Sequence, residues 1–114
     1  MVVLQGQIWW ADLGEPRGSS PGYERPVVVV QADAFNKTSI NTVIVAIVTK
    51  NIRLANMPGN VVLPKRFSGL ESESVINATQ LFTLDRGDLI EHMGTLPANK
   101  IDQISEGLRL VLAL

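Results

Sequence analysis

The amino-acid sequence predicts a mainly β fold of the α+β class: a strongly curled antiparallel sheet or small barrel with one C-terminal helix packed on it. Up to residue 96, short runs of β-branched and aromatic residues alternate with segments rich in Gly, Pro and Ser, as in strands joined by turns. From Pro97 onward the apolar residues recur at every third or fourth position, the spacing of one helix face. A chain of 114 residues suffices for one compact domain, so a single domain is expected over residues 1–114.

The first two predicted strands flank a long connection. Gln7–Leu13 mixes aromatic and aliphatic residues and predicts a strand, and the β-branched run Arg25–Gln31 predicts a strand buried on both faces. Proline cannot donate to a ladder, so Pro26 is expected at the first residue of that strand. The intervening segment Gly14–Glu24 is full of Gly, Pro and Ser, and loops of this length often have a functional role.

The rest of the predicted sheet consists of shorter strands around one more buried run. Thr42–Thr49 is rich in Val and Ile and predicts a second fully buried strand, between a polar turn-like segment at Asp33–Ile40 and an irregular loop at Lys50–Gly59. Further strands are expected at Asn60–Leu63, Glu73–Thr79, Leu81–Leu84 and Ile90–Leu96, with a turn of helix at Asp85–Leu89.

The segment Pro97–Leu114 has the period of a helix. Its apolar face is formed by Ile101, Ile104, Leu108 and Val111, and Leu112 and Leu114 widen this stripe. Proline suits the first helical position, so the helix is expected to begin at Pro97.

Composition excludes several classes of protein. The absence of cysteine excludes disulfides, zinc–thiolate sites and thiol nucleophiles, and it fits a reducing cytoplasm, where we expect the protein. The sequence has no signal-peptide pattern, and its apolar runs are far shorter than the roughly 20 residues that span a bilayer. The net charge is −1, but residues 1–66 hold seven Lys/Arg and four Asp/Glu, whereas residues 67–114 hold three and seven. The basic half could face a polyanion, although charge by itself favours the simpler interpretation of ordinary solvated charges.

Few catalytic chemistries fit the residues. His92 is the only histidine, which excludes a ribonuclease with two catalytic histidines, and no G-x-S-x-G motif supports a serine nucleophile. We expect His92 to be structural or on the surface. The carboxylates show no familiar metal-ligand spacing, and no phosphate-binding glycine motif occurs, so neither a metal nor a nucleotide cofactor is expected.

Polar residues at the ends of the two buried strands are the candidates for binding. Arg25 begins one strand beside the Gly-rich loop, where its guanidinium could pair with a phosphate or with Glu24, Asp12 or a carbonyl. Thr49 ends the other strand before Lys50 and Asn51, a group that could contact sugar or phosphate, although threonine is also simply a good strand former.

Aromatic and amide side chains offer weaker signals. Trp9 and Trp10 are adjacent in a predicted strand, so they point to opposite faces, and at most one can stack on a single-stranded base. At least one belongs to the core, and both are expected to contribute chiefly to packing or to a subunit interface. Gln80 could read a base edge or cap a turn.

An ordered set of motifs completes the pattern. It comprises G-x-I-W-W-A-D-L at Gly6–Leu13, G-S-x-P-G-x-x-R-P-V-V-V-V at Gly18–Val30, a buried strand ending in Thr49, S-V-x-N-x-x-Q at Ser74–Gln80 and a G-L-R-L-V-L helix at Gly107–Leu112. This set resembles the MazF/PemK toxin family, and the resemblance runs from about Gly6 to Leu114.

The resemblance implies an SH3-like barrel with a C-terminal helix, a homodimer, and a ribonuclease that cuts single-stranded RNA at short sequences without a metal. The family's two main catalytic positions fall on Arg25 and Thr49. Candidate RNA contacts by the same resemblance are Ser19, Ser20, Lys50, Asn51, Ser74, Asn77 and Gln80. One departure concerns the first loop, where many relatives read G-S-E and this chain reads Gly18-Ser19-Ser20. That leaves the proton acceptor open, with Glu24 nearby.

The chemistry and the resemblance agree. An enzyme with neither two histidines nor a metal cuts RNA by letting the 2′-hydroxyl attack the phosphate, while the protein aligns the groups and stabilises charge. The expected products are a 2′,3′-cyclic phosphate and a 5′-hydroxyl. The expected partners are single-stranded RNA, a second copy of the chain and an antitoxin with an acidic segment. The alternatives are a toxin of the same fold that binds a protein target such as DNA gyrase, and an SH3-like peptide adaptor.

Overall fold

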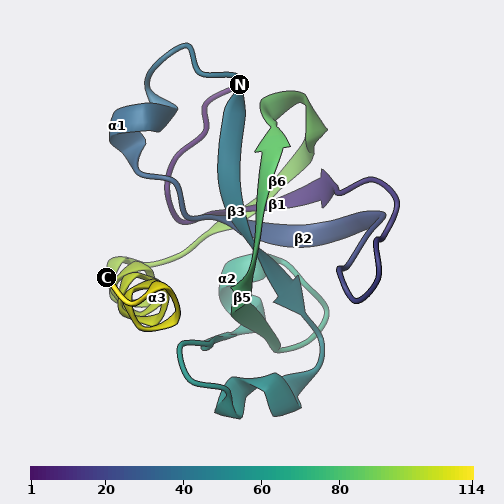
Figure 1. Cartoon of the computed structure of the whole chain (residues 1–114), viewed down its shortest axis with the longest axis vertical. Helices are drawn as coiled ribbons and strands as arrows, with labels where there is room; N and C mark the ends of the chain where they lie inside the picture. Colours follow the sequence, from purple (N-terminus) through teal and green to yellow (C-terminus); the bar gives the residue numbers. More distant parts are fainter.

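The computed structural model describes residues 1–114 and contains one six-stranded antiparallel sheet with the order β4-β5-β3-β2-β1-β6 (Figure 1). The strands are β1 (Gln7–Asp12), β2 (Glu24–Val29), β3 (Thr42–Thr49), β4 (Val61–Leu63), β5 (Ser74–Asp85) and β6 (Leu89–Thr95). The helical elements are α1 (Asp33–Asn36), η1 (Ile52–Asn56), α2 (Lys65–Ser68), η2 (Arg86–Asp88) and α3 (Ala98–Leu112). The expected mainly β fold with a C-terminal helix is confirmed.

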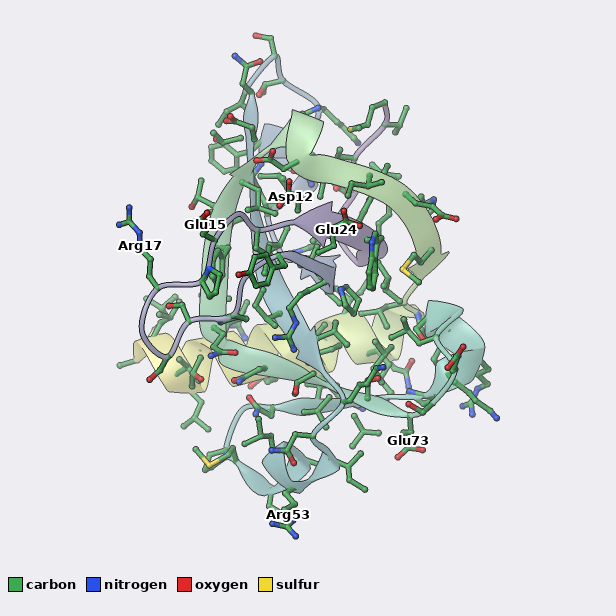
Figure 2. All side chains as sticks on the ribbon, turned by 90° about the vertical axis from the view of Figure 1, so that its right-hand side faces the viewer. Asp12, Glu15, Arg17, Glu24, Arg53 and Glu73 are labelled. Carbon is green, nitrogen blue, oxygen red and sulfur yellow. The ribbon has the colours of Figure 1, made fainter.

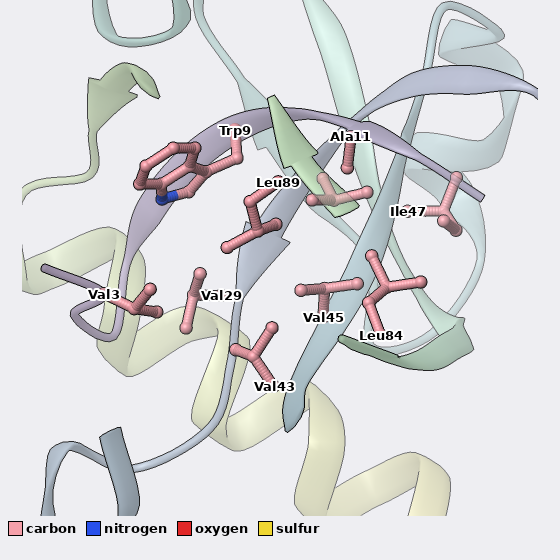
Figure 3. Packing of buried hydrophobic residues seen from close by; sticks show 10 residues of the cluster. Val3, Trp9, Ala11, Val29, Val43, Val45, Ile47, Leu84 and Leu89 are labelled. Carbon is pink, nitrogen blue, oxygen red and sulfur yellow. The ribbon is translucent and has the colours of Figure 1, made fainter. Parts of the chain in front are cut away.

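Both faces of the central strands are covered, which explains their continuous apolar sequences. Val27 and Val29 of β2 point into a first core cluster, shown in Figure 3, together with Trp9 of β1. Val28, the residue between them, points to the opposite face and belongs to a second cluster that includes Ile104 of α3. Because successive strand residues alternate between faces, a strand between two clusters must be apolar at every position.

A short helix links the two edges of the curled sheet. β4 and β6 lie at opposite ends of the strand order, and the short helix α2 follows β4 and packs against β6. Gly94 of β6 lies so close to the carbonyl group of Phe67 in α2 that any side chain there would collide with it. This close approach fixes α2, and with it the segment Gly69–Glu73 that leads into β5.

β5 is one bulged strand where two strands were expected. It pairs with β3 through Ala46↔Leu81 and then through Ile47↔Asn77, so three residues of β5 have no partner in β3. Asn77 organises this bulge: its Oδ1 accepts hydrogen bonds from the backbone N and the Oγ1 of Thr79. The break predicted at Gln80 is therefore a bulge within a continuous strand.

The helix α3 covers the second cluster, but its apolar stripe is narrower than expected. Ile104 is buried, and Ile101 and Leu108 pack against the same cluster. Leu112 and Leu114 are 50% and 85% exposed, so the expectation that they widen the stripe is wrong. Leu112 points about 80° away from Ile104 around the helix axis, and Leu114 follows Ala113, whose left-handed backbone ends the helix. Pro97 lies at the cap position, one residue before the expected place.

Other differences from expectation are local. Pro26 is the third residue of β2, one residue before the ladder to β3 begins at Val27. Ile44 of β3 is 40% exposed, so this strand is not fully buried. The expected loops contain the single-turn helices α1 and η1, and α2 was not predicted. No helix of the structure is both long and apolar enough to cross a membrane.

Candidate active site

A cavity opens where β2 and β3 stop pairing. Their ladder runs from Val29↔Val45 to Val27↔Ile47 and ends there, next to Pro26, which has no N–H to donate. The same register, continued, places Arg25 opposite Thr49, so the two side chains predicted to be catalytic start from facing positions on the two strand ends. Both line a cavity of about 590 Å³.

Residues from five parts of the chain line this cavity. β1 contributes Trp10, and β6 contributes Met93. The remaining lining residues are Glu24, Arg25, Pro26, Val48, Thr49, Lys50, Asn51, Gly69, Leu70, Glu71, Ser72 and Ser74. Figure 2 looks onto this side of the molecule, with Glu24 near its centre, Glu73 at the lower right and Arg53 below.

Arg25 has no partner within the protein. The one ion pair in the structure joins Arg109 to Glu106 on α3, and the Arg25 guanidinium makes neither an ion pair nor a hydrogen bond. The carboxylates that could have neutralised it are engaged elsewhere: Glu24 accepts from Trp10, and Asp12 accepts from the backbone N of Gly14. A half-buried guanidinium at a cavity with all its donors free can bind an oxyanion in a bidentate manner.

Thr49 has a free donor. Its Oγ1 accepts a hydrogen bond of 3.2 Å from the backbone N of Asn51, which occupies an acceptor site of the hydroxyl and leaves its proton available. Asn51 in turn accepts from the backbone N of Arg53 and caps η1. Thr49 therefore points a donor from a rigid strand end, in the half-buried setting that it shares with Arg25.

Three of the predicted RNA contacts, Lys50, Asn51 and Ser74, also line the cavity. Lys50 is exposed and has no partner. Ser74 is buried, and its Oγ donates to the carbonyl oxygen of Ser72 at 3.4 Å.

The remaining predicted contacts lie outside the cavity. Asn77 is buried, shares a face of the sheet with Thr49 through the β3–β5 register, and donates to Oε1 of Gln80 at 3.3 Å. Ser19 and Ser20 are exposed in the loop between β1 and β2. At the base of this loop the backbone N of Tyr23 donates to the carbonyl oxygen of Gly14, and the backbone N of Leu13 donates to that of Tyr23. Arg17, near the tip of the loop, projects away from the body of the molecule (Figure 2). A role in binding RNA stays a prediction for these four residues, as it does for Lys50, Asn51 and Ser74.

The sequence did not point to several lining residues, among them Leu70, Glu71, Ser72 and Met93. Glu71 and Glu73 have the pattern of solvated loop charges, yet the packing of α2 on β6 brings Glu71 to the cavity. No local signal in the sequence could have shown this, because the approach depends on contacts between distant segments.

The two tryptophans separate as strand alternation predicts. Trp9 is buried in the first cluster, stacks on His92 with ring centroids 5.3 Å apart and donates to Oε1 of Gln7. Trp10 lines the cavity and donates from Nε1 to Oε1 of Glu24 at 2.7 Å.

His92 is exposed and lies outside the cavity lining, with Nε2 at 2.8 Å from the carbonyl oxygen of Gly94. No group of three or more His, Asp or Glu side chains is close enough together to hold a metal ion.

The chain is similar to known proteins over nearly its whole length. A family model described as "PemK-like, MazF-like toxin of type II toxin-antitoxin system" matches residues 4–112. The chain is 46% identical to endoribonuclease MazF6 of Mycobacterium tuberculosis over 114 residues, 100% of both chains. It is 37% identical to endoribonuclease EndoA of Bacillus subtilis, covering 100% of this chain and 97% of that one.

Solved structures share the fold. A MazF structure from Deinococcus radiodurans superposes with a TM-score of 0.80 at 23% identity, covering 100% of this chain and 99% of that one. An endoribonuclease from a mycobacterial species, in complex with its cognate antitoxin, has a TM-score of 0.79 at 23% identity, covering 98% and 96%. The chain belongs to the family of PemK-like and MazF-like toxins of type II toxin–antitoxin systems.

Proposed function

We propose that this chain is the toxin of a toxin–antitoxin pair and acts as an endoribonuclease on single-stranded messenger RNA in the cytoplasm, where it inhibits translation and growth. The observation that carries the proposal is the pair Arg25 and Thr49, which face each other at the cavity with free donors. Relatives with the printed name endoribonuclease support the same activity.

The reaction is an intramolecular transfer at phosphorus. The 2′-oxygen of one nucleotide attacks its own 3′-phosphate, the bond from phosphorus to the 5′-oxygen of the next nucleotide breaks, and a 2′,3′-cyclic phosphate and a 5′-hydroxyl are formed. One proton leaves the 2′-hydroxyl, and one is delivered to the departing 5′-oxygen. The protein needs no nucleophile of its own, because alignment and charge stabilisation supply the rate.

Arg25 and Thr49 both stabilise the negative charge of the phosphorane. Negative charge accumulates on the non-bridging oxygens as the phosphorane forms, and the unpaired guanidinium of Arg25 meets it with two parallel donors. The hydroxyl group of Thr49 donates a hydrogen bond to one of the same oxygens. Arginine stays protonated in proteins, so its role is electrostatic.

Glu24 is the proposed proton acceptor. It precedes Arg25 in β2 and lines the same cavity, whereas Ser20 lies in the exposed part of the loop. The indole N–H of Trp10 occupies Oε1 of Glu24 and leaves Oε2 without a hydrogen bond. A carboxylate held in this way can take the proton from the 2′-hydroxyl.

The deciding experiment incubates purified protein with a long single-stranded RNA in EDTA and maps the fragment ends. Wild type should cut at discrete sites and leave cyclic phosphates. Arg25→Ala should lose about 10²–10³ in rate, because a preorganised donor is missing. Arg53→Ala is the matched control: it removes the same charge from an exposed position on η1, outside the cavity, and should cut normally. Intact RNA from folded wild type would contradict the ribonuclease and favour a non-cleaving toxin that binds a protein target such as DNA gyrase.

Two partners belong to the proposal. One solved structure that this chain resembles holds a cognate antitoxin, and we expect an antitoxin here whose acidic, apolar-anchored segment covers Arg25 and blocks cleavage. We also expect a homodimer, because small domains gain from shared burial of apolar surface. Light scattering after size exclusion tests the dimer, and inhibition of cleavage by the co-expressed antitoxin tests the complex.

A further inference from the structure

The cavity is lined by one aromatic side chain, that of Trp10, which phosphate binding does not require. We propose that it is a nucleobase pocket, in which the base of a nucleotide next to the cleaved phosphate stacks on the indole of Trp10, and that Glu24 holds this indole in place. The inference rests on the proposed ribonuclease function and deepens it by assigning a residue that positions the RNA.

Trp10 stands close to the proposed phosphate site. In the β1–β2 register Trp10 pairs with Pro26 and Ala11 pairs with Arg25, so the two side chains start from adjacent pairs that point to opposite faces of the sheet. Because the ladder between β2 and β3 ends at this point, both side chains nevertheless line the same cavity. A nucleotide whose phosphate binds Arg25 in this cavity can therefore place its base on Trp10.

The orientation of the indole is set by a hydrogen bond. Its Nε1 donates to Oε1 of Glu24 at 2.7 Å, and the register Asp12↔Glu24 places Glu24 on the same face of the sheet as Trp10. A ring held at its edge in this way, in a half-buried position on a cavity wall, is preorganised to receive another planar ring. Its neighbour Trp9 is the internal contrast, because it is buried in the core and already stacked on His92.

The surroundings of Trp10 suit a base better than a second phosphate. Pro26, Leu70 and Met93 add apolar surface to the same cavity. The volume of about 590 Å³ lies within the range of small-molecule sites, about 300–1,000 Å³. Proteins commonly recognise single-stranded RNA by taking a base out of the stack and placing it on an aromatic side chain.

A binding experiment tests the pocket without cleavage. The probe is a 2′-O-methylated copy of the long RNA, which cannot undergo 2′-hydroxyl attack, labelled for fluorescence anisotropy. Trp10→Ala should weaken binding by about 5- to 150-fold, the value of one stacked base, whereas Trp10→Phe, which keeps a stacking ring, should stay within about threefold of wild type. RNA should quench the indole fluorescence of wild type and leave that of Trp10→Phe, which retains only the buried Trp9, nearly unchanged.

The controls separate stacking from folding. Phe35→Ala removes an aromatic ring that is 59% exposed on α1 and outside the cavity, and it should bind normally. Thermal melting verifies that each variant is folded. Wild-type affinity in Trp10→Ala would overturn the pocket, as would an equal loss in Trp10→Phe, since that loss would belong to the hydrogen bond with Glu24.

A cleavage experiment locates the stacked base. Abasic nucleotides are placed singly on either side of the mapped cut, and kcat/KM is measured for wild type and Trp10→Ala. Wild type should be impaired by the abasic nucleotide at one position, and Trp10→Ala should be insensitive at that same position. Equal sensitivity of both proteins at every position would overturn the assignment. If wild type cuts nothing yet binds RNA through Trp10, the proposed function fails and the nucleobase pocket stands. If Trp10→Ala cleaves and binds RNA like wild type, the nucleobase pocket fails and the proposed function stands.

Discussion

At the scale of single residues, the site is defined by which side chains lack partners. Arg25 and Lys50 have none, and Thr49 keeps its proton, while Glu24 is held by Trp10. Glu24 and Arg25 are neighbours in β2 and start toward opposite faces of the sheet, which keeps them from neutralising each other. Both side chains therefore keep groups free at the cavity, as the proposed function requires.

Glu24→Gln tests the proton acceptor. The amide can still accept from the indole of Trp10, so the variant should fold and bind RNA like wild type. Because it cannot take a proton, kcat should fall by about 10²–10⁴-fold. Glu71→Gln, which alters the other carboxylate of the cavity, is the matched control and should keep the wild-type kcat. A wild-type kcat in Glu24→Gln would assign the proton to another group.

At the scale of elements, the contact between α2 and β6 positions one wall of the cavity. Gly94 allows β6 to lie against the carbonyl group of Phe67, and the segment that follows α2 carries Leu70 and Glu71 to the cavity. Phe67 and Met93 also pack against the second core cluster. Stability and site geometry are therefore linked at this contact.

Gly94→Ala should lower the stability of the protein and disturb the geometry of the cavity. The added methyl group collides with backbone, so α2 must move, and overpacking of this kind costs about 1–3 kcal/mol of unfolding free energy. Tm should fall by at least about 4 °C, and cleavage should weaken with it. Gly87→Ala is the control, because a Cβ at Gly87 meets no atom within 4 Å. Equal Tm values for the two variants would show that α2 is not fixed by this contact.

The α1 element depends on an ionised carboxylate. A hydrogen bond from the backbone N of Gln5, and then one from Nδ2 of Asn36, hold the pKa of Asp33 below its ordinary value of 3.8. A lowered pKa in the folded state contributes stability that is present above pH 3.8 and is lost as the pH falls through the folded-state value.

Asp33→Asn should therefore lose stability at pH 7 and differ less from wild type near pH 3. Urea unfolding at both pH values measures the difference. Asp102→Asn on the exposed side of α3 is the control. A constant difference between Asp33→Asn and wild type at both pH values would contradict the ionic origin of the effect.

At the scale of the whole molecule, the cavity is not a basic patch. Its lining has Arg25 and Lys50 against Glu24 and Glu71, so the excess of Lys/Arg in residues 1–66 does not gather there. Affinity for RNA must then come from a few directed hydrogen bonds and from stacking, and the attraction between basic side chains and the RNA phosphates contributes only modestly.

The salt dependence of binding measures that share. With two phosphate contacts per protomer, the logarithm of the association constant should fall with the logarithm of salt concentration with a slope of about −1.4. Lys50→Ala should reduce the slope to about −0.7, and Arg53→Ala should leave it unchanged. Anisotropy with the 2′-O-methylated RNA over a range of KCl concentrations provides the measurement. A wild-type slope steeper than about −3 would indicate a wider basic surface than the cavity.

The sequence predicted those features that depend on neighbours along the chain. The runs at β2 and β3 and the period of α3 are local patterns, and Thr42–Thr49 matches its strand at both ends. Arg25 and Thr49 could be named because both stand at the ends of such runs and fall on motifs of a known family. The short helix α2 and the bulge in β5 were not predicted, because a single turn and a three-residue irregularity have no period of their own.

The sequence by itself thus determined the fold class, the family and the two residues at the strand ends, since composition, periodicity and motif order are all properties of consecutive residues. Only the tertiary structure decided that Arg25 is unpaired, that Trp10 and not Trp9 faces the cavity, and that Glu71 and Met93 complete its wall. The physical reason is that pairing, exposure and cavity shape are set by which distant segments meet. In this chain the distant segments meet at two places. The ladder between β2 and β3 ends next to Pro26, and the absence of a side chain at Gly94 lets α2 pack against β6.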